Sequence, residues 1–215
     1  MDPRSPLVFD HIAVACRTLA EGTTHIQQQI GLTIPAGGAH PIMGTHNRLM
    51  ALSDTEFLEA IAVDPGAPAP ARARWYALDS FHDEPRIATW VLGTRDLRGA
   101  LDVLQKRLPH VDLGVPLQVM RDQLMWHLSV PEDGAMPFDG AFPALIEWSD
   151  SVHPAGRMAD LNAQLHSMNI VHPQGDVIRQ ALGDLFPDDR FTIAKGDALS
   201  IEAQIETPDG MRTLT

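Results

Sequence analysis

The sequence is poor in cysteine, in long apolar runs and in basic residues, and each shortage excludes a class of protein. Its single cysteine, Cys16, cannot form an intrachain disulfide, which is typical of a reducing compartment. No apolar run approaches the roughly 20 residues that cross a bilayer, and the first residues show no basic stretch followed by an apolar export segment. Sixteen Lys and Arg against 28 Asp and Glu give a net charge of −12, which repels phosphate backbones. We therefore expect a cytoplasmic protein that binds neither a membrane nor nucleic acid.

Several catalytic and cofactor motifs are missing as well. The sequence contains no glycine-rich phosphate loop, no serine elbow and no paired-cysteine motif. We therefore expect no nucleotide cofactor and no serine-based triad. Hydrophobic residues make up 44% of the 215 residues, enough to bury a core in one larger domain or in two small modules that share a sheet.

The first 64 residues have the pattern strand, helix, strand, strand, strand. The apolar run Val8–Ala15 predicts a strand. Thr18 and Glu21 form a capping box, so we expect a helix from about Leu19 to Ile30, ended by Gly31 in the left-handed conformation. Three strands should follow: an irregular or edge strand within 35–47, rich in Gly and Pro, and regular strands at 46–52 and 57–63.

The pattern restarts after a Pro- and Ala-rich connection, which we assign to residues 65–86. A strand is expected at 87–93, then a helix with Asp96 as N-cap and its leucines on one face, ending near Leu108. Aligning Arg17-Thr18-Leu19 with Arg95-Asp96-Leu97 pairs the two strand-to-helix junctions, which indicates an internal repeat. The first module then spans 7–64 and the second 87–152, with further strands at 117–120, 123–130 and 144–148.

The remaining residues, 153–215, have no counterpart in the repeat. We expect a strand at 169–171, a helix that opens at His172-Pro173, and a hairpin formed by strands at 191–194 and 199–207. Pro208-Asp209-Gly210 should then turn the chain back. Because a strand with one apolar face must lie against something, this extension should pack on the main body.

Ionisable residues interrupt three of the predicted strands. His11 stands in the apolar run of the first strand, Glu59 in Phe57–Ala62, and Glu147 in Ala144–Trp148. Burying a charge without a partner is strongly unfavourable, so His11 and Glu59 need either one another or a cation. The residues alone favour a core histidine hydrogen-bonded to the backbone or to Glu59, and only a resemblance to a known family favours a functional site.

Four stretches resemble the glyoxalase-like domain proteins of bacteria, within the vicinal oxygen chelate superfamily. They are Asp10-His11-Ile12-Ala13-Val14, Gly38-Ala39-His40-Pro41 through Gly44-Thr45-His46-Asn47, Phe57-Leu58-Glu59 with Asp64-Pro65, and Ile146-Glu147-Trp148 with His153-Pro154. The resemblance implies an α+β fold: paired βαβββ modules forming one cupped, mostly antiparallel eight-stranded sheet with helices outside, plus a C-terminal α/β extension.

The same resemblance implies a divalent metal in the cup, held by the first and last strands of each module. Carried over to this chain, the four positions are His11, Glu59, Thr89 and Glu147. Threonine is seldom a metal ligand, which leaves one imidazole and two carboxylates for Zn, Mn, Ni or Fe, with positions open to water or substrate. Without a cation the two acids would repel, and one of them, kept partly neutral, could serve as general acid or base.

Other residues are candidates for the same site. His46 stands in the most family-like stretch, and we expect it, Glu59 or Glu147 to move the proton. His127 shares an alternation face with Met125 and could relay a proton or touch the substrate. The other expected substrate contacts are Thr89, Trp126 and Arg48, and both Arg48 and Arg121 would clamp a substrate carboxylate if they face the cup.

The leading functional hypothesis is an enzyme in which a divalent metal on His11, Glu59 and Glu147 polarises a carbonyl or enediolate of a small oxygenated substrate, with lyase or isomerase chemistry. The alternative is a metal-free protein that sequesters a small molecule in the same cup, motivated by the poor ligand at Thr89. Because members of the superfamily often dimerise, a homodimer is also expected.

Overall fold

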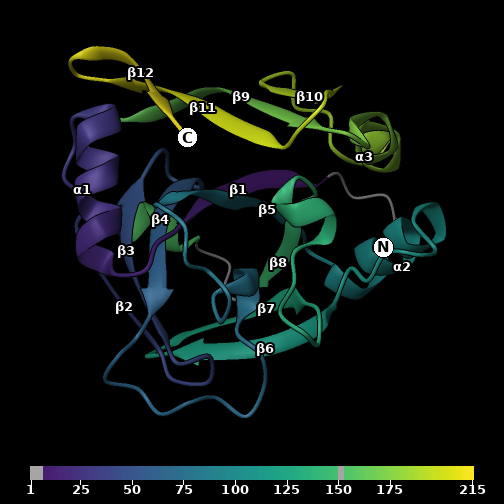
Figure 1. Cartoon of the computed structure of the whole chain (residues 1–215), viewed down its shortest axis with the longest axis horizontal. Helices are drawn as coiled ribbons and strands as arrows, with labels where there is room; N and C mark the ends of the chain where they lie inside the picture. The colour runs from purple at the N-terminus through teal and green to yellow at the C-terminus, as the bar shows by residue number, and fades with distance from the viewer. Residues whose placement is uncertain (1–6, 150–152) are drawn as a thin grey trace.

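The largest element of the computed structural model, which describes residues 7–149 and 153–215, is an eight-stranded sheet. Its strands are hydrogen-bonded in the order β2-β3-β4-β1-β5-β8-β7-β6, so the two modules contribute one continuous half each. The edge strands β2 and β6 approach each other, and the sheet curls into a nearly closed cup (Figure 1). The cupped sheet expected from the sequence is confirmed. The strands are Val8–Ala15 (β1), Ala36–His40 (β2), Thr45–Ala51 (β3), Phe57–Val63 (β4), Arg86–Gly93 (β5), Val115–Arg121 (β6), Leu124–Val130 (β7) and Ala144–Trp148 (β8).

One helix in each half begins where the capping signals predict. Helix α1 (Leu19–Ile30) starts at Thr18, whose hydroxyl accepts a first-turn amide hydrogen, and ends at Gly31 with φ of 77°. Helix α2 (Leu97–Arg107) starts at Asp96, whose carboxylate caps its first turn in the same way. None of the helices in the described residues is long and apolar enough to cross a membrane. The predicted repeat of strand and helix is confirmed, whereas the predicted end of the second module at residue 152 lies outside the described residues.

The two halves join at their first strands. Strand β1 pairs antiparallel with β5, and each pairs in parallel with the last strand of its own half, β4 or β8. The first strands therefore lie side by side at the middle of the sheet. Their inward side chains and those of β4 and β8 come together at the bottom of the cup.

Strand alternation separates the side chains into an inner and an outer core. On β1, His11 and Ala13 face the inside of the cup, whereas Ile12 and Val14 join the outer core beneath the helices and the second sheet. On β4, Phe57 and Glu59 follow the same rule and face inward. Glu59 therefore lies on the inner face, beside the inward side of β1.

The segment predicted as a connection between modules, 65–86, folds back into the cup. Its short 3-10 helix η1 (Trp75–Ala77) has Tyr76 and Ala77 at φ of 57° and 53°, in the left-handed region, and buries Trp75 and Tyr76. The two rings pack in the inner core with Trp126. This connection is thus part of the inner wall, although its composition is that of a loop.

The C-terminal extension forms a second sheet, with strands in the order β10-β9-β11-β12. The prediction that the strands near 191–194 and 199–207 pair with each other as a hairpin is wrong. Both pair instead with β9, which is longer than predicted: β10 in parallel and β11 antiparallel. A parallel partner needs a crossover, and α3 provides it between β9 and β10. The turn at Pro208-Asp209-Gly210 is confirmed, joining β11 to β12. The elements are β9 (Gln164–His172), α3 (Gly175–Leu182), β10 (Phe191–Lys195), β11 (Ser200–Thr207) and β12 (Gly210–Leu214).

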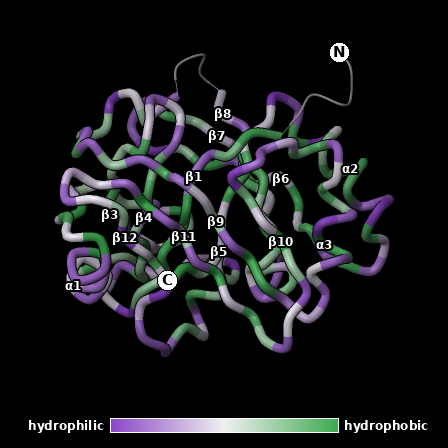
Figure 2. The backbone as a smooth tube through the Cα atoms, turned by 90° about the horizontal axis from the view of Figure 1, so that it is seen from above, coloured by the Kyte–Doolittle hydropathy of each residue, from purple (hydrophilic) through white to green (hydrophobic). Residues whose placement is uncertain are grey.

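This second sheet packs across the outer face of β1 and β5, as Figures 1 and 2 show from two directions. Trp90 of β5 stacks on Phe191 of β10 with ring centroids 5.1 Å apart. At the edge of the contact, Arg190 donates two hydrogen bonds to the carboxylate of Glu56, at 2.7 and 3.1 Å. The second sheet and the cupped sheet thus share the outer core.

Candidate functional site

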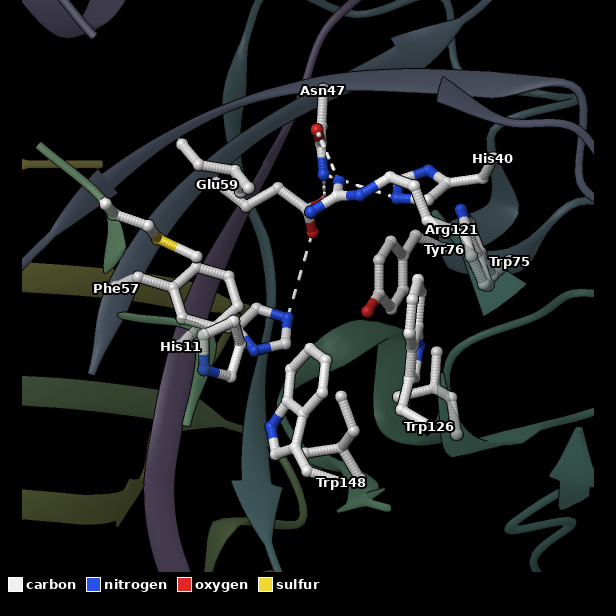
Figure 3. Close-up of a pocket in the computed structure, with 15 residues that line it drawn as sticks. His11, His40, Asn47, Phe57, Glu59, Trp75, Tyr76, Arg121, Trp126 and Trp148 are labelled. Carbon is white, nitrogen blue, oxygen red and sulfur yellow. Dashed lines mark hydrogen bonds and ion pairs between the residues drawn. The ribbon is translucent and has the colours of Figure 1, made fainter. Parts of the chain in front are cut away.

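A pocket lies on the inner side of the cup, lined by residues of β1, β2, β3, β4, β6, β7, β8 and η1 (Figure 3). Its wall combines a buried polar row with aromatic rings. The residues of the segment that follows β8, Pro154 and Met158, cover one side of it. The polar row begins at Asp10 and His11 and continues through Glu59 and Asn47 to His40.

Asp10 holds His11 in place. The register between β1 and β5 shifts at this point, so Asp10 has no cross-strand partner, and such a bulge redirects side chains. Its Oδ1 lies 2.6 Å from Nδ1 of His11, and its Oδ2 accepts hydrogen bonds from Nε1 of Trp148 at 2.8 Å and Nε2 of His153 at 3.0 Å. Burial alone would raise the pKa of Asp10, but the bonds and charges of the two imidazoles outweigh it and hold the pKa below 3.8. Asp10 is therefore a carboxylate, and it fixes the His11 tautomer with hydrogen on Nδ1.

Asn47 holds Glu59 from the other side. Its Oδ1 accepts hydrogen bonds from the Gly38 amide at 2.8 Å and from Arg121 at 3.3 Å, which fixes the orientation of the side-chain amide. Its Nδ2 then donates to Oε1 of Glu59 at 2.6 Å and lies 3.3 Å from Nε2 of His40. Burial, with the nearby positive charges of Arg121 and His46, lowers the pKa of His40 to about 3, so this imidazole is neutral and can accept the bond.

The side chains of His11 and Glu59 lie next to each other without a hydrogen bond between them. Nε2 of His11 and Oε2 of Glu59 are 3.7 Å apart, too far for a hydrogen bond. The two residues are 3% and 5% exposed. Each therefore keeps one proton-binding atom that faces the pocket and has no hydrogen bond from the residues that the structure describes (Figure 3).

Aromatic rings form the rest of the wall. Trp126 and Trp148 lie 5.3 Å apart between centroids, and Phe57 stacks on the His11 ring at 4.2 Å. The hydroxyl of Tyr76 points into the middle of the pocket (Figure 3). Its burial, and then the negative charges of Glu59 and Asp10, raise its pKa well above 10, so it stays a hydroxyl that can donate a hydrogen bond.

The comparison with known families agrees with this architecture. The glyoxalase-like domain family matches residues 9–186, which include both modules and the start of the extension. The chain belongs to the glyoxalase-like domain family. No curated protein matches it.

The likeness to solved structures concerns the fold. A hypothetical protein from Staphylococcus aureus is 16% identical, with a TM-score of 0.64 over 90% of this chain and 88% of that chain. Methylmalonyl-CoA epimerase from Mycobacterium tuberculosis is 17% identical, with a TM-score of 0.41 over 67% and 89%. A variant of the Streptomyces coelicolor epimerase in complex with 2-nitronate-propionyl-CoA is 15% identical, with a TM-score of 0.43 over 68% and 100%. The glyoxalase-like family expected from the sequence is confirmed by the family match over residues 9–186.

Of the metal ligands expected for this glyoxalase-like protein, the structure brings His11 and Glu59 together but not Glu147. On β8, Ile146 and Trp148 line the pocket, so alternation turns Glu147 outward. There its Oε2 accepts a hydrogen bond from the amide of Leu97 at 2.8 Å and caps the start of α2. His127, opposite Glu147 across the strand pair, points outward for the same reason.

The register of the two halves explains this difference. Counting back equally from the caps Thr18 and Asp96 pairs Ala13 of the first half with Val91 of the second. Ala13 lies opposite Glu59 on β4, whereas Val91 lies opposite Ala144 on β8. The structural counterpart of Glu59 is therefore an alanine, and Glu147 occurs farther along β8.

The other expected site residues also divide into those that line the pocket and those that do not. Trp126 lines the pocket, but His46 and Arg48 alternate with the inward Thr45 and Asn47 on β3 and lie on the opposite face, beside Asp64. Thr89 lies in an adjoining cavity behind Trp75 and Tyr76, where its hydroxyl donates to the carbonyl of Gly140. Thr89 and the pocket are thus on opposite sides of η1.

The donor set does not fit a resident divalent metal, although members of the vicinal oxygen chelate superfamily often bind one. Catalytic zinc sites use three protein ligands, and this pocket offers Nε2 of His11 and Oε2 of Glu59. Both oxygens of Asp10 are engaged by other donors. Within the described ranges, no group of three or more His, Cys, Asp or Glu side chains is arranged to hold an ion.

Several pocket residues escaped the sequence analysis. Asp10 could have been predicted, because it is the second polar residue in one apolar run. Asn47 could have been predicted too, because it directly follows His46 in the family-like stretch. Trp75 and Tyr76 had none, since they stand in a Pro- and Ala-rich segment without periodicity. Only the return of this segment into the cup makes them part of the wall.

Proposed function

We propose that this protein is an isomerase-type enzyme that moves a proton next to a carbonyl group of a small substrate. The observation that carries the proposal is the pair of free atoms, Nε2 of His11 and Oε2 of Glu59, buried side by side at 3.7 Å in an aromatic pocket. Two proton-accepting atoms on one wall suit the movement of protons between neighbouring atoms of an enediolate.

Each group has a defined role in this reaction. Glu59, held through Oε1 by Asn47, takes the proton from the carbon next to the carbonyl with Oε2. The electron pair of that C–H bond becomes the enediolate, whose oxygen receives a hydrogen bond from the Tyr76 hydroxyl. His11, oriented by Asp10, takes the proton of the neighbouring hydroxyl with Nε2 and delivers it to the enediolate oxygen. Glu59 then gives the proton that it took to the adjacent carbon. This step completes an isomerisation and restores the Glu59 carboxylate.

The test follows the first step and needs no knowledge of the product. Proton NMR in D2O would measure exchange of the carbon-bound hydrogen in a panel of α-hydroxyketones, α-hydroxyaldehydes and 1,2-diketones with phenyl or isobutyl groups. We expect protein-dependent exchange in at least one compound. Glu59→Gln should slow it by about 100-fold or more, the usual contribution of a general base.

The matched control is Glu206→Gln, which removes an exposed carboxylate from β11 in the second sheet. This variant should exchange as fast as the wild type. Absence of exchange across the panel, or equal rates in Glu59→Gln and the wild type, would contradict the proposed reaction.

The aromatic wall favours a second candidate, a protein that binds such a molecule without converting it. Three of the four tryptophans of the chain, Trp75, Trp126 and Trp148, line the pocket, so a bound ligand should quench intrinsic fluorescence. Saturable quenching by a compound whose hydrogen does not exchange would favour sequestration over catalysis.

A further inference from the structure

Arg121 is a positively charged residue of the pocket that forms no ion pair with an acidic side chain among the described residues. Arg121 extends from β6 toward β2 and passes over Gly38, where an added Cβ would lie 2.8 Å from its Cδ atom. Its guanidinium donates to the neutral amide of Asn47. In residues 7–149 and 153–215, the arginines that form ion pairs are Arg17, Arg74, Arg86, Arg107, Arg179 and Arg190.

A second donor beside it is also unused. Trp75 is 3% exposed, and its Nε1 is buried with no hydrogen-bond partner among the described residues. Its ring meets His40 edge-on at 5.1 Å, and the indole nitrogen lies at the end of the ring on the side of His40 and Arg121 (Figure 3). An unpaired buried donor is costly, and an acceptor supplied by a ligand would remove that cost.

The other residues of the pocket wall restrict which ligands can supply this acceptor group. Trp126 and Trp148 offer flat apolar surface, and the Tyr76 hydroxyl provides a further donor. Asn47 stands between Arg121 and Glu59, bonded to both, so an anion bound at Arg121 is kept apart from the Glu59 carboxylate.

We infer that the substrate class is a small aromatic monocarboxylate, whose carboxylate is held by Arg121 and Nε1 of Trp75 and whose ring lies against Trp126 and Trp148. The inference rests on the proposed function for the chemistry at Glu59, but the binding it describes stands by itself. It also assigns Trp75 a recognition role, which its place in a Pro- and Ala-rich connection did not indicate.

Calorimetric titration with matched acid and neutral ligands tests the inference. The probes are phenylacetate against phenylacetamide, and phenylglyoxylate against its methyl ester. The wild type should bind each acid about tenfold or more tightly than its neutral partner, because an arginine–carboxylate pair adds charge-assisted hydrogen bonds. Arg121→Met should weaken the acids by about 10- to 100-fold and change the neutral partners less than about threefold. Trp75→Phe, which keeps a ring and removes the N–H, should weaken the acids by about 3- to 10-fold.

The control Arg95→Met removes one positive charge from an exposed residue before α2 and should change neither affinity. Equal affinity for acid and neutral partner, no measurable binding of either pair, or an acid preference that survives in Arg121→Met would each overturn the inference. Because the exchange assay uses uncharged carbonyl compounds, failure here leaves the proposed reaction standing. Acid preference in a wild-type protein that exchanges the hydrogen of no panel compound would instead support the binding and contradict the chemistry.

Discussion

Replacing Asp10 by asparagine removes one charge from the centre of the polar row while keeping its shape. Asp10 is 2% exposed and accepts from His11, Trp148 and His153. Asparagine has one acceptor oxygen, and Nε1 of Trp148 can only donate, so that oxygen must turn toward Trp148. The new NH2 group then faces Nδ1 of His11 and forces hydrogen onto its Nε2, the wrong tautomer for the proposed reaction.

The size of the effect follows from the bonds that change. Hydrogen bonds to a buried charge contribute about 1.5–3 kcal/mol each. The charged bond with His11 is lost, and the bonds from Trp148 and His153, which share Oδ2, persist only as weaker bonds to a neutral amide oxygen. We expect Asp10→Asn to lower the free energy of unfolding by about 2–4 kcal/mol at neutral pH. For a chain of this length that corresponds to a melting temperature lower by about 5–15 °C.

The pH dependence has a defined sign. The pKa of Asp10 is lowered in the folded state, so its contribution is present above the unfolded-state value of about 3.9 and is lost as the pH falls through the folded-state value. The difference between wild type and Asp10→Asn should therefore shrink as the pH falls from about 5 to about 3.

Urea unfolding across this pH range, with nitrogen-15 NMR of the histidine tautomers, measures both consequences. Asp197→Asn, at an exposed aspartate before β11, is the control and should match the wild type. An Asp10→Asn protein with wild-type stability and with hydrogen still on Nδ1 of His11 would refute the reasoning.

Three further predictions concern other parts of the molecule. Arg190→Met should loosen the second sheet and lower the free energy of unfolding by about 1 kcal/mol, since Arg190 and Glu56 are only partly buried; a urea midpoint equal to that of the exposed control Arg212→Met would contradict it. Burial raises the pKa of the Cys16 thiol to about 12, so an aromatic disulfide reagent at about pH 8 should label it only after unfolding, and rapid labelling of the native protein would contradict this. Protein purified without chelator should contain well under one equivalent of zinc, manganese, nickel or iron; one equivalent that is lost in His11→Ala would show that the two-donor argument is wrong.

Much of the secondary structure, including where the helices begin and end, could be predicted from the sequence. The helix caps Thr18 and Asp96 and the end at Gly31 depend on neighbouring residues alone, and all three are confirmed. The hairpin of the extension was wrong because apolar alternation identifies a strand without naming its partner, and β9 competes for both strands. The cytoplasmic location, the module boundaries and the homodimer stay predictions.

The candidate site was predictable only in part. His11 and Glu59 stood out because buried charges need partners, and the structure places them together. Glu147 stood out by the same rule, but its partner is the amide of Leu97 at the start of α2. A charge in an apolar strand thus indicates that a partner exists, without saying on which face of the sheet it lies.

By itself, the sequence determined the periodic elements, their caps, the duplicated halves and the family, because each depends on residues near one another in the chain. Tertiary structure alone decided that Asp10 bulges toward His11, that Trp75 and Tyr76 return into the cup, and that Arg121 crosses to Asn47. Those contacts join residues far apart in the chain or depend on the exact strand register, and a shift of one residue turns every side chain of a strand to the other face.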